Sequence, residues 1–428
     1  MNRSCISTKI LDALLNKYER SSAYREDTTP TRRILLDLYN DGRSDFPDYD
    51  IEKSDKRLAV NRTVMDLAAN DIIGYEWMRG EKDHILSRIW LLPVNLPLAY
   101  KAADRIPQSE TATQVLTELH ATLAQTAAPW AHAYLQDLIC ETIAKRKTPA
   151  TLPTDPRDRA DLLAGIVAAA NLSPGECTER VLSLQIYGDS KRFEHAIKPR
   201  LLSILRKHQD HDDDTPDDDL LRQIGITRYP EQFEFCGPLT AAYPLGAVDF
   251  APITGGCVLY SSDFFSENRD GVHKLPLTLA PETTTILSIE NRANYLDYIQ
   301  NKNDNELVLY HGGQFSPRKQ LFFQAIAAQM NGKMKWYHWS DMDYGGFLML
   351  SRLRREIRPD VLSYRMGIDD LERYMLYTAP ISEAYKTRLE TLLTRPELSD
   401  SHACIRLMID KKIRLEQEAM LIKKEQSQ

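Results

Sequence analysis

Apolar residues in the first hundred positions recur at helical spacing and then in strand-like runs. In KRLAVNRTVMDLAAN, Val60, Val64 and Leu67 are spaced as on one face of a helix. Two β-rich runs follow, IIGYEWM and HILSRIWL, separated by the polar turn RGEKD. Helix, strand, turn and strand is the order of a winged helix. Residues 1–105 are therefore predicted to form a winged-helix-like, DNA-binding domain.

The middle of the chain has a different pattern. Residues 106–208 are predicted to form a helical arm, because Val115, Leu119 and Leu123 repeat at helical spacing. An acidic run then begins at Asp210, and repulsion among its carboxylates opposes compaction. Residues 209–224 are therefore predicted to be a solvated linker.

Strand-like and helix-like runs alternate from residue 225 to residue 428. The apolar or aromatic runs are CVLYSS, TTTILSIE, ELVLYHGG, KWYHWSDMD and DVLSYRMG. Amphipathic helical runs separate the later ones, which favours a parallel sheet covered by helices. The fold class is thus mixed: winged-helix-like and helical regions, then an α/β domain with a Rossmann-like parallel sheet.

Composition excludes several protein classes. The six cysteines form no CxxC pair, which argues against a zinc ribbon and a disulfide framework. The chain shows no apolar run long enough for a membrane helix and no secretory signal, so we expect a cytoplasmic protein without a membrane partner. The net charge is −7, yet residues 311–365 carry nine Lys and Arg against four Asp and Glu. This local excess suits a phosphate-bearing substrate.

Acidic residues stand where two of the predicted strands end. Asp341 and Asp343 follow KWYHWS, and Glu290 ends TTTILSIE. Residues two apart on extended backbone point the same way, and the carboxyl ends of parallel strands share one edge of a sheet. Carboxylate oxygens suit Mg²⁺ or Mn²⁺. We therefore expect Glu290, Asp341 and Asp343 to bind one divalent ion.

This glutamate-and-DxD arrangement resembles the Toprim domain of primases and topoisomerases, with a core at about residues 281–370. A closer resemblance, strongest from about residue 180 onward, is to the JetD family, the nuclease subunit of the Wadjet anti-plasmid system. It rests on IYGDSKRFE, SIENRANYLDYI, YHGGQFSPRKQLF, YHWSDMDYGGFLMLSRLRR and RLEQEAM.

The resemblance implies roles for specific residues. Glu290, Asp341 and Asp343 would be the catalytic metal ligands, and Glu416 or Glu418 of the EQE tail could add a further ligand. Basic residues near these motifs are expected to contact DNA, although Lys191 and Arg192 fit a packing or dimer role equally well. The expected contacts are Arg318, Lys319, Arg352, Arg354, Arg355, Lys191 and Arg192.

The expected function is Mg²⁺- or Mn²⁺-dependent hydrolysis of small circular double-stranded DNA by a homodimer. No GxxxxGK[ST] motif occurs, so ATP hydrolysis would fall to a partner complex of an SMC-type ATPase, a kleisin and a winged-helix subunit. Two alternatives stay open. One is a topoisomerase VI A-like transesterase using Tyr24 or Tyr39, and the other is a non-catalytic winged-helix DNA-binding subunit.

Overall fold

The computed structural model describes residues 3–39, 44–172, 176–211, 215–268, 271–313 and 315–422. It divides into two compact units, one of residues 1–126 with 131–163 and one of residues 127–130 with 164–428. The division falls inside helix α7 (Pro156–Ala170), not at residue 105 or 208. Among the described residues, no helix is both long and apolar enough to cross a membrane.

The N-terminal unit begins with two helices packed on a small antiparallel sheet. Helix α1 (Arg3–Glu19) contacts α3 (Ser54–Ala69), and the strand order is β1-β3-β2. The strands are β1 (Leu35–Asp37), β2 (Ile73–Trp77) and β3 (Leu86–Leu91). Val60 and Val64 of α3 are buried in one core with Leu11 of α1, as their helical spacing predicts. Further helices of this unit are α2 (Ser22–Arg25), α4 (Leu96–Ala102), α5 (Gln108–Ala124) and α6 (Pro129–Lys145).

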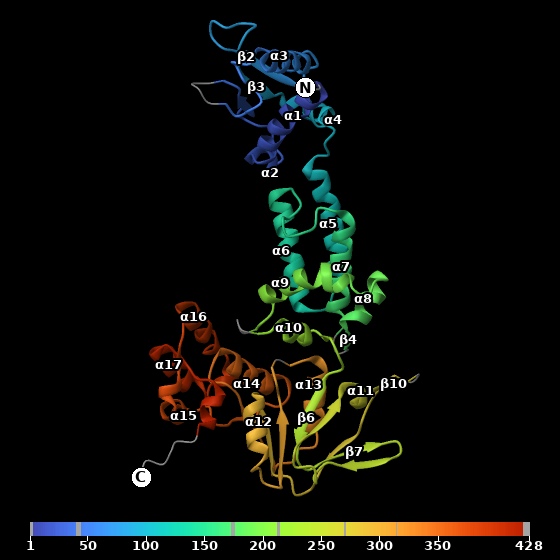
Figure 1. The fold of residues 1–428 in the computed structure, drawn as a ribbon, viewed down its shortest axis with the longest axis vertical. Helices are drawn as coiled ribbons and strands as arrows, with labels where there is room; N and C mark the ends of the chain where they lie inside the picture. Colours follow the sequence, from blue (N-terminus) through green and yellow to red (C-terminus); the bar gives the residue numbers. More distant parts are fainter. Residues whose placement is uncertain are drawn as a thin grey trace. The chain divides into compact units, whose positions relative to one another are not determined.

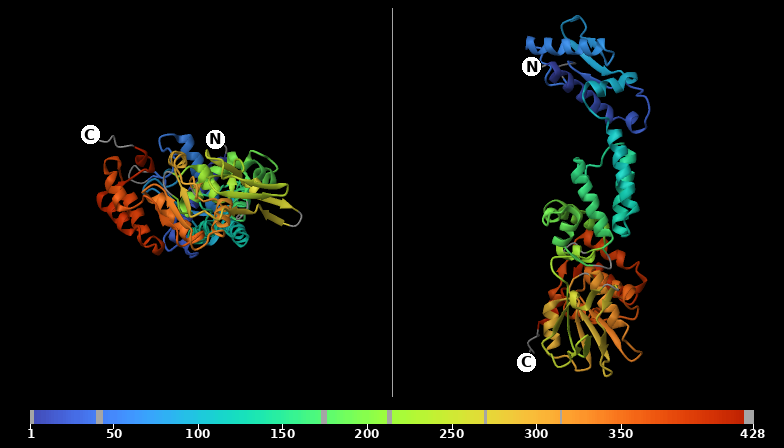
Figure 2. Two further views of the ribbon diagram at one scale, coloured as in Figure 1. Left: turned by 90° about the horizontal axis from the view of Figure 1, so that it is seen from below. Right: turned by 90° about the vertical axis from the view of Figure 1, so that its right-hand side faces the viewer.

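The second unit is built around a mixed sheet, which Figures 1 and 2 show. Its strand order is β16-β15-β13-β14-β6-β9. Strands β13, β14, β15 and β16 run parallel, whereas β6 and β9 are antiparallel additions. The bounds are β6 (Gln232–Cys236), β9 (Cys257–Tyr260), β13 (Thr285–Ile289), β14 (Glu306–Tyr310), β15 (Lys335–Trp339) and β16 (Leu362–Ser363). Each run predicted as a strand contains one of these strands, but CVLYSS pairs antiparallel.

Helices cover this sheet. The crossover helices are α12 (Arg292–Ile299), α13 (Pro317–Ala327) and α14 (Tyr344–Glu356). Because parallel crossovers are right-handed, the strand order puts α12 on one face and α13 and α14 on the other. Large side chains such as Trp336, Phe322 and Phe347 fill the core. Beside the sheet lie β7 (Leu239–Tyr243), β8 (Gly246–Asp249), β10 (Phe265–Asn268), β11 (Gly271–Lys274), β12 (Leu277–Leu279) and α11 (Ser261–Phe264).

Shorter elements precede and follow the sheet. Before it come β4 (Cys177–Thr178), α8 (Glu179–Tyr187), a π-helical turn η2 (Phe193–Ile197), α9 (Lys198–His208), α10 (Asp217–Gln223) and β5 (Ile226–Thr227). After it come α15 (Ile368–Arg373), β17 (Ala379–Pro380), α16 (Glu383–Leu392), α17 (His402–Lys411), β18 (Ile413–Arg414) and the 3-10 turn η5 (Gln417–Leu421). The segment expected to be a linker thus contains α10, whose Leu220 and Leu221 are buried.

Candidate metal centre

The carboxyl ends of β13 and β15 meet at one edge of the sheet. The strands pair in parallel with Ile289 opposite Trp339, so the residues after them emerge side by side. The Glu290 N–H donates to Trp339 O at 2.9 Å, and the Asp341 N–H donates to Glu290 Oε2 at 3.3 Å. The structure therefore places Glu290 directly beside Asp341, although 51 positions separate them.

Asp343 caps the start of helix α14 at the same edge of the sheet. It is the N-cap of α14, where its Oδ1 accepts the Gly346 N–H at 2.7 Å. A carboxylate at this position satisfies a free helix N–H and meets the positive end of the helix dipole. Asp343 is 8% exposed. It therefore lies next to Asp341 with one oxygen already engaged in the cap.

The C-terminal tail brings two more carboxylates to this edge. Met342 and Leu415 form a small antiparallel bridge, in which each N–H donates to the other residue's carbonyl at 2.9 and 3.1 Å. The chain then continues past Asp341, and the Gln417 N–H donates to Asp341 Oδ1 at 2.6 Å. Residues far apart in sequence thus converge because the tail pairs with the end of β15.

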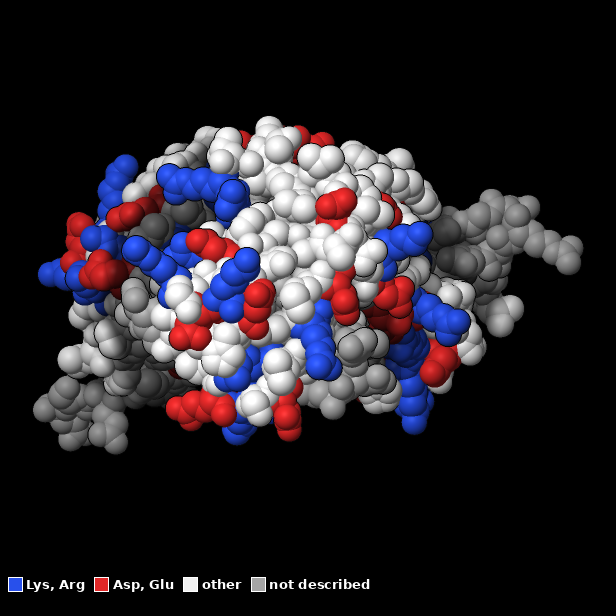
Figure 3. Space-filling model, turned by 90° about the horizontal axis from the view of Figure 1, so that it is seen from above, with Lys and Arg blue, Asp and Glu red and all other residues white. Residues whose placement is uncertain are grey.

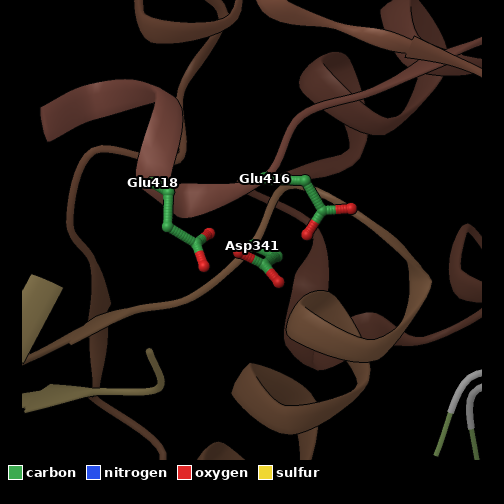
Figure 4. Close-up of side chains that lie close together, drawn as sticks. All are labelled: Asp341, Glu416 and Glu418. Carbon is green, nitrogen blue, oxygen red and sulfur yellow. The ribbon is translucent and has the colours of Figure 1, made fainter. Parts of the chain in front are cut away.

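Asp341, Glu416 and Glu418 form a carboxylate cluster whose candidate ligand oxygens lie within 4.8 Å of one another. Figure 4 shows the three carboxylates turned toward a common space. The glutamates are exposed and Asp341 is partly buried. The cluster differs from the triad predicted from sequence, since it joins Asp341 to the two tail acids, while Glu290 and Asp343 flank it.

The electrostatics of this cluster favour a cation. Burial and the neighbouring charge of Asp343 raise the pKa of Asp341 to about 8, and Glu416 and Glu418 add to the effect. The Gln417 N–H opposes the shift by stabilising the ionised carboxylate. A proton or a divalent cation would relieve this repulsion. The donors are all carboxylate oxygens, the ligand type that Mg²⁺ and Mn²⁺ prefer, so the residues fit such an ion.

Two of the residues predicted to contact DNA have their charges paired inside the protein. Lys319 is 4% exposed, and its Nζ donates to His311 O at 2.6 Å and lies 3.5 Å from Glu231 Oε1. Arg354 is 7% exposed and makes a bidentate pair with Asp400 at 2.6 and 2.8 Å. Both side chains lie on the buried faces of their helices. A run of basic residues in the sequence does not reveal which face each side chain occupies. Neither is available to a phosphate in this structure.

The other predicted DNA contacts differ in their surroundings. The guanidinium of Arg318 lies 4.2 Å from the ring centre of Phe265, and Arg352 donates to Asp210 O at 2.7 Å. Arg355 is exposed and pairs with Glu356 at 2.7 Å. Lys191 is exposed and Arg192 is partly buried. Arg355 and Lys191 therefore remain open to solvent, and the structure brings neither into the carboxylate cluster.

Amide residues around the cluster were not predicted from the sequence. Asn291 Nδ2 donates to Glu418 Oε1 at 2.6 Å, and the buried Asn294 donates to Gln417 O at 2.9 Å. The Asn291 N–H donates to Gln417 Oε1 at 3.1 Å. Their positions, directly after Glu290 and between the two tail glutamates, were the only signal that could have found them.

Comparisons with known proteins point to one family. Residues 272–427, which contain all of these carboxylates, match the family model described as Wadjet protein JetD, C-terminal. The chain is also 25% identical over 415 residues to the Wadjet protein JetD of Bacillus cereus (strain Q1). That alignment covers 97% of this chain and 98% of the relative. Residues 272–427 therefore match the C-terminal region of the JetD family, and similarity to a Wadjet protein of that family extends over nearly the whole chain.

Proposed function

We propose that this Wadjet subunit is a metal-dependent endonuclease that hydrolyses the phosphodiesters of double-stranded DNA. The observation that supports the proposal most is the cluster of Asp341, Glu416 and Glu418 at the carboxyl edge of a parallel sheet. Reactive groups collect at this edge in open α/β folds. The glutamate after β13 and the DxD after β15 support a Toprim domain as its framework.

In this proposal, the acidic residues of the site have different roles. Asp341, Glu416 and Glu418 hold Mg²⁺ or Mn²⁺, and Glu290 and Asp343 complete the acidic surroundings. When bound, the ion supplies positive charge to the scissile phosphate and its leaving oxygen. Asp343 also fixes the start of α14, so the loop holding Asp341 keeps its shape. The tail residues hold their carboxylates in place through the Met342–Leu415 bridge.

The N-terminal unit is the proposed DNA-binding part of the chain. Its order of helix, strand, helix and two strands, with the antiparallel sheet β1-β3-β2, supports a winged helix. Lys56 and Arg62 are exposed on α3, and Arg79 and Lys82 are exposed in the turn between β2 and β3. The face in Figure 3 shows Lys and Arg interspersed with Asp and Glu. We therefore assign DNA contact to these four exposed side chains by their place on α3 and in the β2–β3 turn.

Hydrolysis is favoured over a covalent tyrosine mechanism. Tyr24 is 3% exposed, and its hydroxyl donates to Arg146 O at 3.0 Å. Burial raises the pKa of Tyr24, which makes the phenolate a costly nucleophile. Tyr39, the other candidate, is only partly buried. We therefore expect the protein to cut phosphodiesters without forming a covalent protein–DNA adduct. We also expect Tyr24→Phe and Tyr39→Phe to cut DNA as wild type does.

The cellular role follows from the family and is part of the proposal. A Wadjet complex with an SMC-type ATPase, a kleisin and a winged-helix subunit would present small circular DNA to this chain. A homodimer would place one carboxylate cluster at each strand of the duplex. The complex would also restrain cutting, because a free nuclease would damage the chromosome.

Plasmid cutting by the purified protein and by its Wadjet complex tests the function. Asp341→Ala and Glu290→Ala are expected to abolish Mg²⁺- or Mn²⁺-dependent cutting, by at least about 100-fold, because they remove charge that positions the ion. Circular dichroism and a DNA-binding assay should show a folded protein that still binds DNA. Full cutting by both variants would refute the proposal. DNA binding without metal binding in the wild type would favour a non-catalytic subunit.

A further inference from the structure

Three amide residues surround the carboxylate cluster, and we call Asn291, Asn294 and Gln417 the amide clamp. Gln417 is fully buried and links the ends of two strands, because its Oε1 accepts the Asn291 N–H and its Nε2 donates to Trp339 O at 3.4 Å. Its carbonyl accepts Asn294 Nδ2 at 2.9 Å. The clamp therefore fixes the tail against β13, β15 and α12 at the point where its glutamates begin.

The clamp also engages one oxygen on each of two carboxylates. Asp341 Oδ1 accepts the Gln417 N–H at 2.6 Å, and Glu418 Oε1 accepts Asn291 Nδ2 at 2.6 Å. Short hydrogen bonds to carboxylate oxygens set the orientation of the carboxylate plane, and they are strongest when the carboxylate is ionised. A weaker contact acts on the third acid, since Arg414 lies 3.6 Å from Glu416 Oε1. Asp341 and Glu418 thus each offer the cluster one oxygen that the clamp does not hold.

Single-oxygen ligands suit some divalent ions better than others. Mg²⁺ requires near-ideal octahedral geometry with short bonds, and carboxylates usually bind it through one oxygen. Ca²⁺ takes 6–8 oxygens at longer distances and commonly uses both oxygens of a carboxylate. A carboxylate whose second oxygen is held by an amide cannot rotate freely to bind in the two-oxygen manner.

We propose that Asn291, through its side-chain amide, and Gln417, through its backbone N–H, are specificity-determining positioning residues, which hold Glu418 and Asp341 as single-oxygen ligands and so favour Mg²⁺ or Mn²⁺ over Ca²⁺. The inference rests on the proposed function, because it assumes that the cluster binds a divalent ion. It goes further by assigning the choice of ion to two uncharged residues that need not touch the metal.

The variant Asn291→Ser tests the clamp with little change elsewhere. Asn291 Oδ1 caps α12 by accepting the Ala293 and Asn294 N–H groups, and serine is also a favourable N-cap. Serine lacks the amide donor to Glu418, so both oxygens of Glu418 become available. Isothermal titration of the metal-free full chain with Mn²⁺ and with Ca²⁺ gives both affinities. We expect the variant's affinity ratio to shift toward Ca²⁺ by about tenfold, the low end of the usual effect of residues supporting metal ligands.

The matched control is Asn305→Ser. Asn305 also donates through its side-chain amide, to Thr284 Oγ1 at 2.7 Å, but it lies at the opposite end of β13. This control should leave both affinities unchanged. An equal loss of Mn²⁺ and Ca²⁺ affinity in Asn291→Ser would show a purely structural role and overturn the proposal.

A second variant examines the buried member of the clamp. Gln417→Met keeps the size of the side chain and the backbone N–H to Asp341, but it removes the side-chain bonds to Asn291 and Trp339 that fix the tail, so Mn²⁺ affinity should fall by about 10- to 100-fold. Gln324→Met is its control, because Gln324 Nε2 donates to Glu356 O at 3.1 Å, away from the cluster. Equal Mn²⁺ affinity in Gln417→Met and wild type would contradict the proposal.

The wild-type titration distinguishes failure of the clamp from failure of the metal site. Wild type binding Ca²⁺ as tightly as Mn²⁺ would overturn the inference about the clamp and leave the proposed nuclease intact. Wild type binding neither ion would instead remove the proposed metal site, and the inference with it.

Discussion

Asp341 is a carboxylate held where its negative charge is unfavourable. It is partly buried beside Asp343 and the two tail glutamates, and its pKa rises to about 8. The folded chain therefore keeps a proton on Asp341 that the unfolded chain releases near pH 4. Between these pH values the unfolded state binds fewer protons, so this group makes the free energy of unfolding fall as the pH rises.

Replacing Asp341 by asparagine should therefore stabilise the metal-free protein. The side-chain oxygen of asparagine can still accept the Gln417 N–H, but asparagine never ionises. We expect the free energy of unfolding at pH 8 to exceed that of wild type by on the order of 2 kcal/mol, and the difference to shrink as the pH falls toward 4. Urea denaturation in EDTA from pH 5 to 8.5 measures it, with the exposed Asp297→Asn as the charge-removal control. A variant less stable than wild type at pH 8 would contradict the predicted increase in the free energy of unfolding.

Individual site residues were predictable to different degrees. Glu290 and the DxD pair stand at strand ends, so local pattern alone predicted their proximity, and the structure places Glu290 against Asp341. The amide clamp could not be predicted in this way. Asparagine and glutamine are common surface residues, and the contact between Asn291 and Gln417 spans 126 positions.

At the scale of elements, the start of α14 depends on a close approach between two backbone segments. A Cβ atom on Gly346 would lie 2.0 Å from Asp341 O and 2.8 Å from Ser340 Oγ. The nearest atom, Asp341 O, is backbone, so it cannot move away without shifting the DxD loop. Glycine is therefore required for steric reasons where α14 meets β15.

Gly346→Ala should destabilise the fold by at least about 2 kcal/mol, in the range for overpacked sites. It should also weaken Mn²⁺ binding, because the shift displaces Asp341. Thermal denaturation and Mn²⁺ titration check the two effects. Gly332→Ala is the matched control, since its Cβ would meet nothing within 4 Å. Similar behaviour of the two variants would show that the steric conflict at Gly346 is easily relieved.

The sequence predicted the parallel strands better than the rest of the fold. Continuous apolar runs identify β13, β14 and β15, which helices cover on both faces. The antiparallel pairing of β6 and β9 was not predictable, because a run of apolar residues does not reveal strand direction. The sequence pattern did not predict helix α10, because repulsion among the acidic residues favoured a solvated linker. Its acids lie in the first helical turn, and Asp217 and Asp219 pair with Arg206 and Arg222 at 2.7 and 2.6 Å.

At the scale of the whole molecule, proposed DNA binding and proposed chemistry belong to different units. The basic residues assigned to DNA binding lie in the N-terminal unit, while every residue of the carboxylate cluster lies in the second. The two compact units were not predictable from sequence, since helical periodicity continues through α7 without a break. Loss of one function should therefore leave the other measurable.

Lys56→Ala combined with Arg62→Ala tests this separation. The double variant should bind DNA more weakly regardless of its sequence, and the slope of log affinity against log salt should fall by about 2, since each phosphate contact contributes about one. Fluorescence anisotropy at several salt concentrations measures the slope, and Mn²⁺ affinity should be unchanged. Lys101→Ala with Lys147→Ala, also exposed in this unit, is the control. An unchanged slope would exclude α3 from the DNA surface.

The bridge between Met342 and Leu415 has a consequence for the timing of synthesis. The strands of the sheet leave the ribosome first, and Glu416 follows β16 by about 50 residues, which takes seconds at roughly 5–20 residues per second. A nascent chain can therefore assemble its sheet before the proposed metal ligands of the tail have been made. Under the proposed function, translation order alone would keep unfinished copies from cutting DNA.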